Sequence, residues 1–266
     1  MAKKEEETGA RARLEEAEAA LVGHSSGAML LSDFLESFEK SSRLSKEERL
    51  RIIDQALLLL EMNYVHLPLK RAMHAIDPIQ RLKLLRFRLS EIKEDKLPPE
   101  MAFHRNILEI FASTRDLHTL YLLPAPFRDR VAYLPFLIEQ YFEGGNKGER
   151  VEKFMISRVV TEFYQSVSNA GPEVLSFVPG VDVLYWNGVP IRRAIEINGE
   201  TQAGSNPDAR FARGLDNLTI RPLEISLPPD ERWVTVTYRS LSGKILTLKQ
   251  DWLVYVTEAA DEATTE

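Results

Sequence analysis

His118 is the residue of this 266-residue chain best suited by type and surroundings to acid–base chemistry. It lies in the stretch Arg115-Asp-Leu-His-Thr119, at a predicted junction between a helix and a strand, where side chains can point into a cleft. A general base needs an orienting group and a nucleophile within hydrogen-bond reach, and Asp116 and Thr119 are candidates for the orienting role. The alternative is a structural histidine that ties a loop to backbone carbonyls.

The sequence shows no partner with which such a base would form a complete catalytic centre. We recognise no serine in the strand-to-helix context of a nucleophile elbow. The chain has no cysteine, which excludes a thiolate nucleophile, disulfides and thiolate zinc sites. The other histidines, His24, His66, His74 and His104, lack partners at the spacing of a His-Glu-x-x-His metal site. We therefore expect no metal, no cofactor and no catalysis by this sequence alone.

The composition is that of an ordinary globular protein. Apolar residues make up 44% and charged residues 28% of the chain, with a net charge of −6. No block of basic residues stands out, which argues against nucleic acid as a partner. No apolar run approaches the roughly 20 residues of a membrane span, so we expect no membrane partner. The charged N-terminus does not have the pattern of a secretory signal, which favours a cytoplasmic location.

Helix-start signals predict a helical domain over residues 28–114. Ser45-Lys-Glu-Glu48 has the pattern of a capping box. Asp77-Pro78 combines an N-cap residue with a proline at the first helical position, and Pro98-Pro99-Glu100 opens a third helix. Residues 1–27, rich in Glu, Ala and Arg, are predicted to form a charged helical arm.

Beyond Arg115 the pattern changes to short apolar strands. Asn206-Pro207 is expected to cap a helix that Gly214 ends. Residues 257–266 are small and acidic and are predicted to form a solvated tail. The predicted strands are Thr119–Leu123, Val131–Phe142, Phe154–Val160, Val181–Trp186, Trp233–Tyr238 and Ile245–Leu248.

The stretch from Gly180 to Ile191 resembles a known module. An apolar strand runs into Asn187-Gly188, a pair that favours a tight turn because both residues tolerate positive φ. The order of residues in this stretch is similar to the Gly-Asp-Val-Ile-Leu-x-Ile-Asn-Gly-x-Pro-Val segment of PDZ-like modules in bacterial proteases. The resemblance implies an α+β fold, in which the helical N-terminal domain is followed by a PDZ-like β-rich module. This module and the His-containing junction before it would span residues 115–256.

PDZ-like modules bind an extended peptide as an added strand on a sheet edge, beside a helix. By resemblance, Tyr133–Phe136 would be the loop that holds a ligand carboxylate, and Phe136–Phe142 the groove strand. Pro135 has no amide hydrogen, so it removes one donor from that loop. An internal segment of an unfolded protein is therefore as good a candidate ligand as a free C-terminus, and a β-layer with a closed edge is the alternative. The candidate peptide-binding residues are Leu134, Pro135, Phe136, Ile138 and Gln140.

Taken together, the helical part, the Arg115–Thr119 junction and the PDZ-like segment resemble the carboxy-terminal (tail-specific) processing family of serine proteases. The similarity is to the branch with a His-containing triad, like the tricorn core and the chlamydial secreted protease, and it spans most of residues 40–255. In that family the His before the PDZ-like module is the general base, which implies this role for His118. The family's nucleophilic Ser lies in a domain after the module. We expect that domain to be missing, because 14 residues follow Trp252.

We interpret the chain as the non-catalytic N-terminal half of a tail-specific-type serine endopeptidase that captures an extended peptide and is inactive alone. A catalytic domain or another protein would be its second partner. One alternative is a stand-alone peptide-binding or scaffold protein in which His118 is structural. Another is an assembly component whose residues 1–27 bind a partner.

Overall fold

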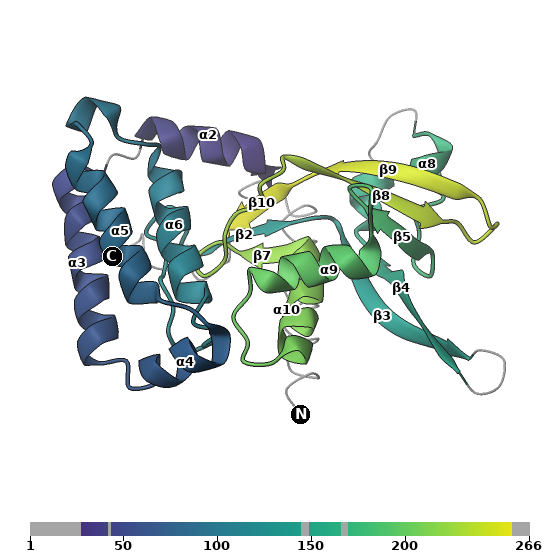
Figure 1. The fold of residues 1–266 in the computed structure, drawn as a ribbon. Helices are drawn as coiled ribbons and strands as arrows, with labels where there is room; N and C mark the ends of the chain where they lie inside the picture. Colours follow the sequence, from purple (N-terminus) through teal and green to yellow (C-terminus); the bar gives the residue numbers. More distant parts are fainter. Residues whose placement is uncertain (1–27, 42–43, 145–148, 166–169, 257–266) are drawn as a thin grey trace, which may run out of the picture.

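The computed structural model describes residues 28–41, 44–144, 149–165 and 170–256 (Figure 1). The predicted arm (1–27) and tail (257–266) lie outside these residues. The fold is α+β, as predicted: a helical layer comes first and a β-rich region follows. No described helix is both long and apolar enough to cross a membrane.

The helical layer begins after a two-residue strand, β1 (Met29–Leu30). Ser45 accepts a hydrogen bond from the amide of Glu48, and the Glu48 carboxylate accepts one from the amide of Ser45, which confirms the predicted capping box. Asp77 caps the next predicted helix through the amide of Gln80 at 3.0 Å. The layer contains α2 (Leu31–Ser41), α3 (Lys46–Met62), α4 (Leu67–His74), α5 (Pro78–Glu91), the 3-10 turn η1 (Glu94–Lys96) and α6 (Glu100–Ala112).

The β-rich region, here called the PDZ region, contains two antiparallel sheets. The smaller sheet has the order β1-β10-β2-β7 and includes β2 (Arg130–Tyr133), β7 (Ile220–Pro222) and β10 (Leu253–Val256). The larger has the order β3-β4-β5-β8-β9, with β6 paired to β5. Its strands are β3 (Phe136–Gly144), β4 (Arg150–Val159), β5 (Asp182–Trp186), β6 (Val189–Pro190), β8 (Trp233–Arg239) and β9 (Ile245–Asp251).

Four helices accompany the sheets: α7 (Thr161–Gln165), α8 (Pro172–Leu175), α9 (Ile191–Glu200) and α10 (Pro207–Thr219). The pair α9 and α10 lies between the helical layer and the larger sheet (Figure 1). The predicted Asn187-Gly188 turn is confirmed, since both residues have positive φ, 49° and 78°. The Asn187 side chain also accepts a hydrogen bond from the amide of Thr235 at 2.7 Å, which ties the turn to β8.

Two strand predictions need correction. The segment Thr119–Leu123 is not a strand. Two of its side chains pack inward instead: Leu123 is buried in one core, and Tyr121 contacts the cores of both regions. The predicted strand Val131–Phe142 is two strands, since the chain leaves the smaller sheet at Leu134-Pro135 and enters the larger one as β3.

Gly214 does not end its helix, contrary to the sequence prediction, because α10 continues to Thr219. Here the missing side chain of glycine allows α9 and α10 to cross in close contact. A Cβ on Gly214 would lie 2.4 Å from the carbonyl oxygen of Ile195, and one on Gly199 would lie 2.7 Å from that of Arg210. The helix α9, which the sequence analysis missed, is the other half of this crossing.

Candidate functional site

Strand β3 lies at the end of the larger sheet, so it pairs with β4 on one side and faces α10 on the other. A groove of about 610 Å³ runs along this edge, here called the edge groove. Ile138 and Gln140 line it from β3, and Phe211 and Leu215 line it from α10. Because alternate backbone N–H and C=O groups of an edge strand point away from its single partner, the groove offers backbone hydrogen bonds as well as apolar contacts.

Several charged side chains around the edge groove are already paired with one another. Gln140 donates to the carboxylate of Glu152, and Arg192 forms an ion pair with the same carboxylate. Arg192 also lies 5.0 Å above the ring of Phe211. The hydrogen bond to Glu152 raises the pKa of the Arg192 guanidinium. At Gln140 and Arg192 the groove can therefore contribute shape and backbone groups to a ligand, because their side chains are already engaged with Glu152.

The structure divides the five predicted peptide-binding residues into two sets. Ile138 and Gln140 line the edge groove, whereas Leu134, Pro135 and Phe136 are buried beneath it. The amide of Leu134 donates to the carbonyl of Thr219 at 2.8 Å, and the amide of Phe136 donates to the carbonyl of Leu134 at 2.7 Å. Pro135 has no amide hydrogen. These three positions of the predicted four-residue carboxylate loop thus lack a free donor in this conformation.

His118 is exposed on the junction between the helical layer and the PDZ region. Asp116 does not bond its ring: one carboxylate oxygen accepts from the backbone amide of His118 at 3.0 Å, and the other accepts from the hydroxyl of Tyr64 at 2.6 Å. Burial raises the pKa of Asp116, but the hydrogen bonds from Tyr64 and the His118 amide outweigh it and lower that pKa. Burial raises the pKa of Tyr64 to about 12. Tyr64, which no motif marks, thus fixes the backbone that carries His118.

The segment Gly23-His24-Ser25-Ser26-Gly27 has the Gly-x-Ser-x-Gly spacing of a nucleophile elbow, and it lies outside the described residues. Within the described residues, no group of three or more His, Asp or Glu side chains could hold a metal ion.

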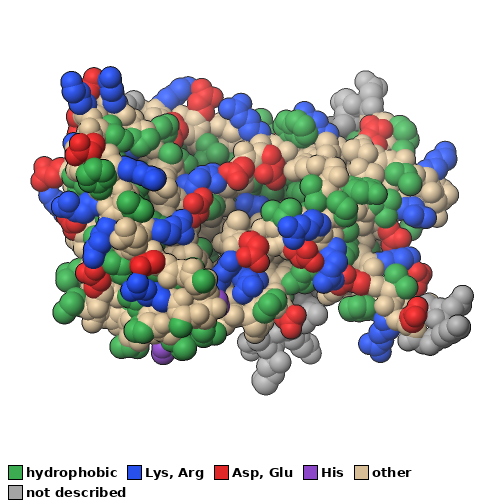
Figure 2. Space-filling view, viewed as in Figure 1, with side chains coloured by type: hydrophobic (Ala, Val, Ile, Leu, Met, Phe, Trp, Pro, Cys, Tyr) green, Lys and Arg blue, Asp and Glu red, His purple; other side chains and the backbone are tan. Residues whose placement is uncertain are grey.

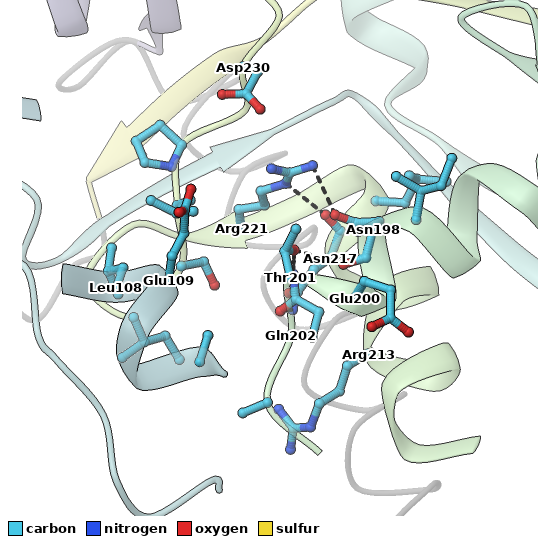
Figure 3. A pocket seen from close by; sticks show the side chains of 18 of the residues that line it. Leu108, Glu109, Asn198, Glu200, Thr201, Gln202, Arg213, Asn217, Arg221 and Asp230 are labelled. Carbon is cyan, nitrogen blue, oxygen red and sulfur yellow. Dashed lines mark hydrogen bonds between the residues drawn. The ribbon is translucent and has the colours of Figure 1, made fainter. Parts of the chain in front are cut away.

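A larger cavity of about 1030 Å³, here called the central cavity, lies where α6 and the junction face α9, α10 and β7 (Figure 3). The face of the molecule in Figure 2 carries acidic and basic side chains intermixed, without a block of one sign. Arg105 pairs with Asp230 at 2.5 Å, and Arg115 pairs with Glu200 at 2.6 Å. Both pairs join the helical layer to the PDZ region across the cavity.

Arg221, from β7, extends into the middle of the central cavity (Figure 3). Its Nε donates to the backbone carbonyl of Asn217 at 2.9 Å, and its Nη2 donates to the side-chain oxygen of Asn198 at 3.3 Å. Asn198 in turn donates to the carbonyl of Gly214 at 2.7 Å, and Asn217 donates to the side chain of Gln202 at 2.8 Å. The guanidinium is therefore held in one orientation by a network of amides. No sequence motif pointed to Arg221.

A sheet edge that faces a helix across a groove is the architecture of a PDZ-like peptide-binding module. A model of the PDZ domain family matches residues 130–262, which is half of the chain. The chain therefore belongs to the PDZ domain family.

Solved structures extend the likeness to the helical layer. The crystal structure of mature CPAF, a chlamydial tail-specific-like protease, matches with a TM-score of 0.55 and 16% identity over 83% of this chain. Mature CPAF complexed with lactacystin matches with a TM-score of 0.54 and 15% identity over the same share. Each match covers 38% of the CPAF chain, so this chain spans well under half of that length. At these identities the likeness shows the fold. The chain has no match among curated proteins.

Proposed function

We propose that this chain captures an extended peptide segment in the edge groove, as the substrate-binding, non-catalytic half of a tail-specific-type serine endopeptidase. The observation that carries the proposal is the open edge of β3 facing α10, with Ile138, Phe211 and Leu215 as apolar walls. PDZ domains typically bind peptide segments in this way, so the family membership supports the same ligand class.

The ligand is an internal, strand-like segment rather than a free C-terminus. The loop that would hold a carboxylate has its amides at Leu134 and Phe136 engaged in internal hydrogen bonds. A carboxylate there would have to displace these bonds and find no donor at Pro135. An internal segment would bind the β3 edge and would not need donors from the loop. Its binding is therefore compatible with the engaged amides of Leu134 and Phe136.

The relation to proteolysis rests on the CPAF-like fold and on the position of His118. We propose His118 as the general base for a serine that another domain or chain supplies. The exposure of His118 at the junction supports this role, and so does the anchoring of its backbone by Asp116. Because this proposal takes the serine from another domain or chain, we expect the chain alone to bind peptides without cutting them.

Titration of the ¹⁵N-labelled chain with an apolar peptide, acetylated and amidated at its ends, tests the binding mode. We expect chemical-shift changes along β3 and α10. Methylation of alternate peptide nitrogens should reduce affinity by about tenfold or more, because strand addition requires those N–H groups. Equal affinity of the methylated and unmethylated peptides would contradict binding by strand addition.

A matched pair of variants tests the location. Phe211→Ala removes an apolar wall of the edge groove, whereas Phe142→Ala removes a 55% exposed ring at the far end of the same strand β3. We expect about a tenfold loss of peptide affinity for Phe211→Ala and no change for Phe142→Ala, since a buried aromatic contact is worth roughly 1–3 kcal/mol. Equal affinities for the two variants would place the ligand elsewhere.

Hydrolysis of unfolded casein tests the non-catalytic assignment. We expect none from this chain. Hydrolysis that disappears in both His118→Ala and Ser25→Ala would overturn the assignment and would make the Gly23–Gly27 segment a nucleophile elbow.

A further inference from the structure

The guanidinium of Arg221 has no acidic partner. Among the described residues, no carboxylate lies within ion-pair distance of it, and its Nη1 makes no hydrogen bond. Its two bonds go to neutral oxygens, those of Asn217 and Asn198, and the guanidinium also lies 5.5 Å from the centre of the Trp252 ring. A cation that is oriented by neutral acceptors, with donors left over, is prepared for an anion that the protein itself does not supply.

Most acidic groups around the central cavity are engaged by other cations. Glu200 pairs with Arg115, Asp230 with Arg105, and Glu109 lies 3.8 Å from Arg81. Glu231 also lines the cavity and, with Asp230, acts on Arg221 through space, where both raise its pKa against the larger lowering by burial. An arginine stays protonated throughout the ordinary pH range, so a full positive charge remains in the cavity.

The central cavity combines these polar groups with apolar walls. Leu108 lines it from the helical layer, Leu120 from the junction that follows, and Ala194, Ile197 and Leu218 from α9 and α10. A small inorganic anion would leave these walls uncovered. The cavity volume of about 1030 Å³ is at the upper end of what ligand sites offer. The combination of one oriented guanidinium with apolar walls selects an anion that carries an apolar body.

We propose that the central cavity is a second ligand site, which binds a carboxylate on an apolar chain, with Arg221 as the partner of the carboxylate. The planar guanidinium forms charge-assisted hydrogen bonds with carboxylates, and its free Nη1 provides the donors. The site is separate from the edge groove, and it does not depend on the proposed function. The C-terminus of an apolar peptide and a fatty acid share this chemistry.

Three probes distinguish these sources and test the charge. The first is an N-acetylated tetrapeptide of apolar residues with a free C-terminal carboxylate, the second is the same peptide with a C-terminal amide, and the third is octanoate. Isothermal calorimetry and ¹⁵N chemical shifts of Asn198 and Asn217 report binding. We expect the carboxylate form to bind at least about tenfold more tightly than the amide, because a charge-assisted bond is lost. Binding of octanoate alone assigns a fatty acid, and binding of the peptide acid assigns a peptide C-terminus.

Arg221→Met tests the anchor and should abolish the preference for the carboxylate over the amide. Since Arg221 also ties β7 to α9 and α10, a second variant avoids the folding problem. Ile197→Glu adds a negative charge to the cavity wall at a position that is 49% exposed. Its control is Ile245→Glu, 61% exposed on β9 and not part of either cavity wall. We expect Ile197→Glu to weaken carboxylate binding by about tenfold and Ile245→Glu to leave it unchanged.

Three results would overturn the proposal: no binding of either acid at millimolar concentration, equal affinity of the peptide acid and the amide, or equal affinities of the Ile197→Glu and Ile245→Glu variants.

Discussion

The edge groove and the central cavity share one wall, the α9–α10 pair, but they offer opposite kinds of recognition. In the edge groove several side-chain charges are paired, as in Arg192 with Glu152, and β3 is the last strand of its sheet. In the central cavity it is a side chain, Arg221, that lacks an ionic partner. Backbone recognition tolerates many ligand sequences, whereas recognition by one oriented charge selects a chemical group.

This contrast is the basis on which we propose two ligands for one PDZ region. The first site requires an unpaired sheet edge, which depends on where β3 lies in the strand order. The second requires the helical layer and the junction after it, because Leu108 and Leu120 line the cavity on that side. The edge groove is therefore a property of the PDZ region, and the central cavity is a property of the two regions packed together. Three substitutions or conditions test this contrast.

Gly214→Ala should have the largest effect on stability, because the added Cβ would push α10 away from α9, and these two helices form the wall that both sites share. A Cβ there would lie 2.4 Å from the carbonyl oxygen of Ile195 and 2.7 Å from the amide nitrogen of Gly199. Alanine normally stabilises a helix interior by about 1 kcal/mol relative to glycine, so the clash must reverse the sign. We expect a loss of about 3 kcal/mol in the free energy of unfolding, measured by urea denaturation, and weaker binding at both sites.

The control for this change is Gly144→Ala, where a Cβ would meet nothing within 4 Å. We expect its free energy of unfolding to stay within about 0.5 kcal/mol of the parent protein. Equal free energies of unfolding for Gly214→Ala and Gly144→Ala would contradict the close crossing of α9 and α10.

Arg115→Ala should have an intermediate effect that is confined to the central cavity. Arg115 donates to the carbonyls of Glu200 and Gln202, at 2.7 and 3.1 Å, and pairs with the Glu200 carboxylate. Because that carboxylate is 62% exposed, solvent screens the pair, and we expect a loss of about 1–2 kcal/mol. Hydrogen exchange should become faster in α9 and the junction but not in β3 and β4.

Arg51→Ala is the matched control, since Arg51 pairs with Glu47 at 3.2 Å on an exposed helix face. An exposed pair of this kind is worth about 0.5 kcal/mol or less. Equal losses of stability in the two arginine variants would mean that Arg115 does not join the two regions.

Acidification should have the smallest effect on the free energy of unfolding, and this effect should also be confined to the surroundings of the central cavity. His104 is fully buried behind Tyr121, whose hydroxyl lies 2.9 Å from Nδ1 and whose side chain lines the cavity. Burial lowers the pKa of His104, although the hydrogen bond with Glu100 opposes this. Since the folded pKa lies below the unfolded value of about 6.5, the stabilisation is complete above that pH and declines as the pH falls towards the folded pKa.

The decline is at most about 1.4 kcal/mol per pH unit for one proton. We expect His104→Gln to flatten the dependence of the free energy of unfolding on pH below about 6.5, while His118→Gln, at an exposed position, serves as the control. An unchanged slope in His104→Gln would assign the pH dependence to other groups.

The parts of the fold that were predictable depend on interactions within a few residues. The capping box at Ser45 and Glu48, the Asp77 cap and the Asn187-Gly188 turn all formed as predicted, because each is closed by hydrogen bonds or backbone preferences of adjacent residues. The prediction that Gly214 ends a helix was wrong. A glycine has the same local preference whether it ends a helix or lets another backbone approach, and only the approach of α9 distinguishes the two.

The candidate site was predictable in part for the same reason. The resemblance to PDZ-like modules assigned Ile138 and Gln140 to the groove strand, and both line the edge groove, whereas the burial of Leu134 and Phe136 depends on the change of sheet at Pro135. Arg221 had no sequence signal, since its partners Asn198 and Asn217 are common residue types with no characteristic spacing.

The sequence by itself determined that a helical layer precedes a PDZ region, that His118 stands at the junction, and that Asn187-Gly188 turns the chain. These features follow from local chemistry, which neighbouring residues carry wherever the chain folds. The tertiary structure alone decided which edge of the sheet stays open, which amides at Leu134 and Phe136 are engaged, and that Arg221 faces a cavity without an acidic partner. Such properties depend on which distant segments come together, and the packing of helices and sheets settles that only when the whole chain is folded.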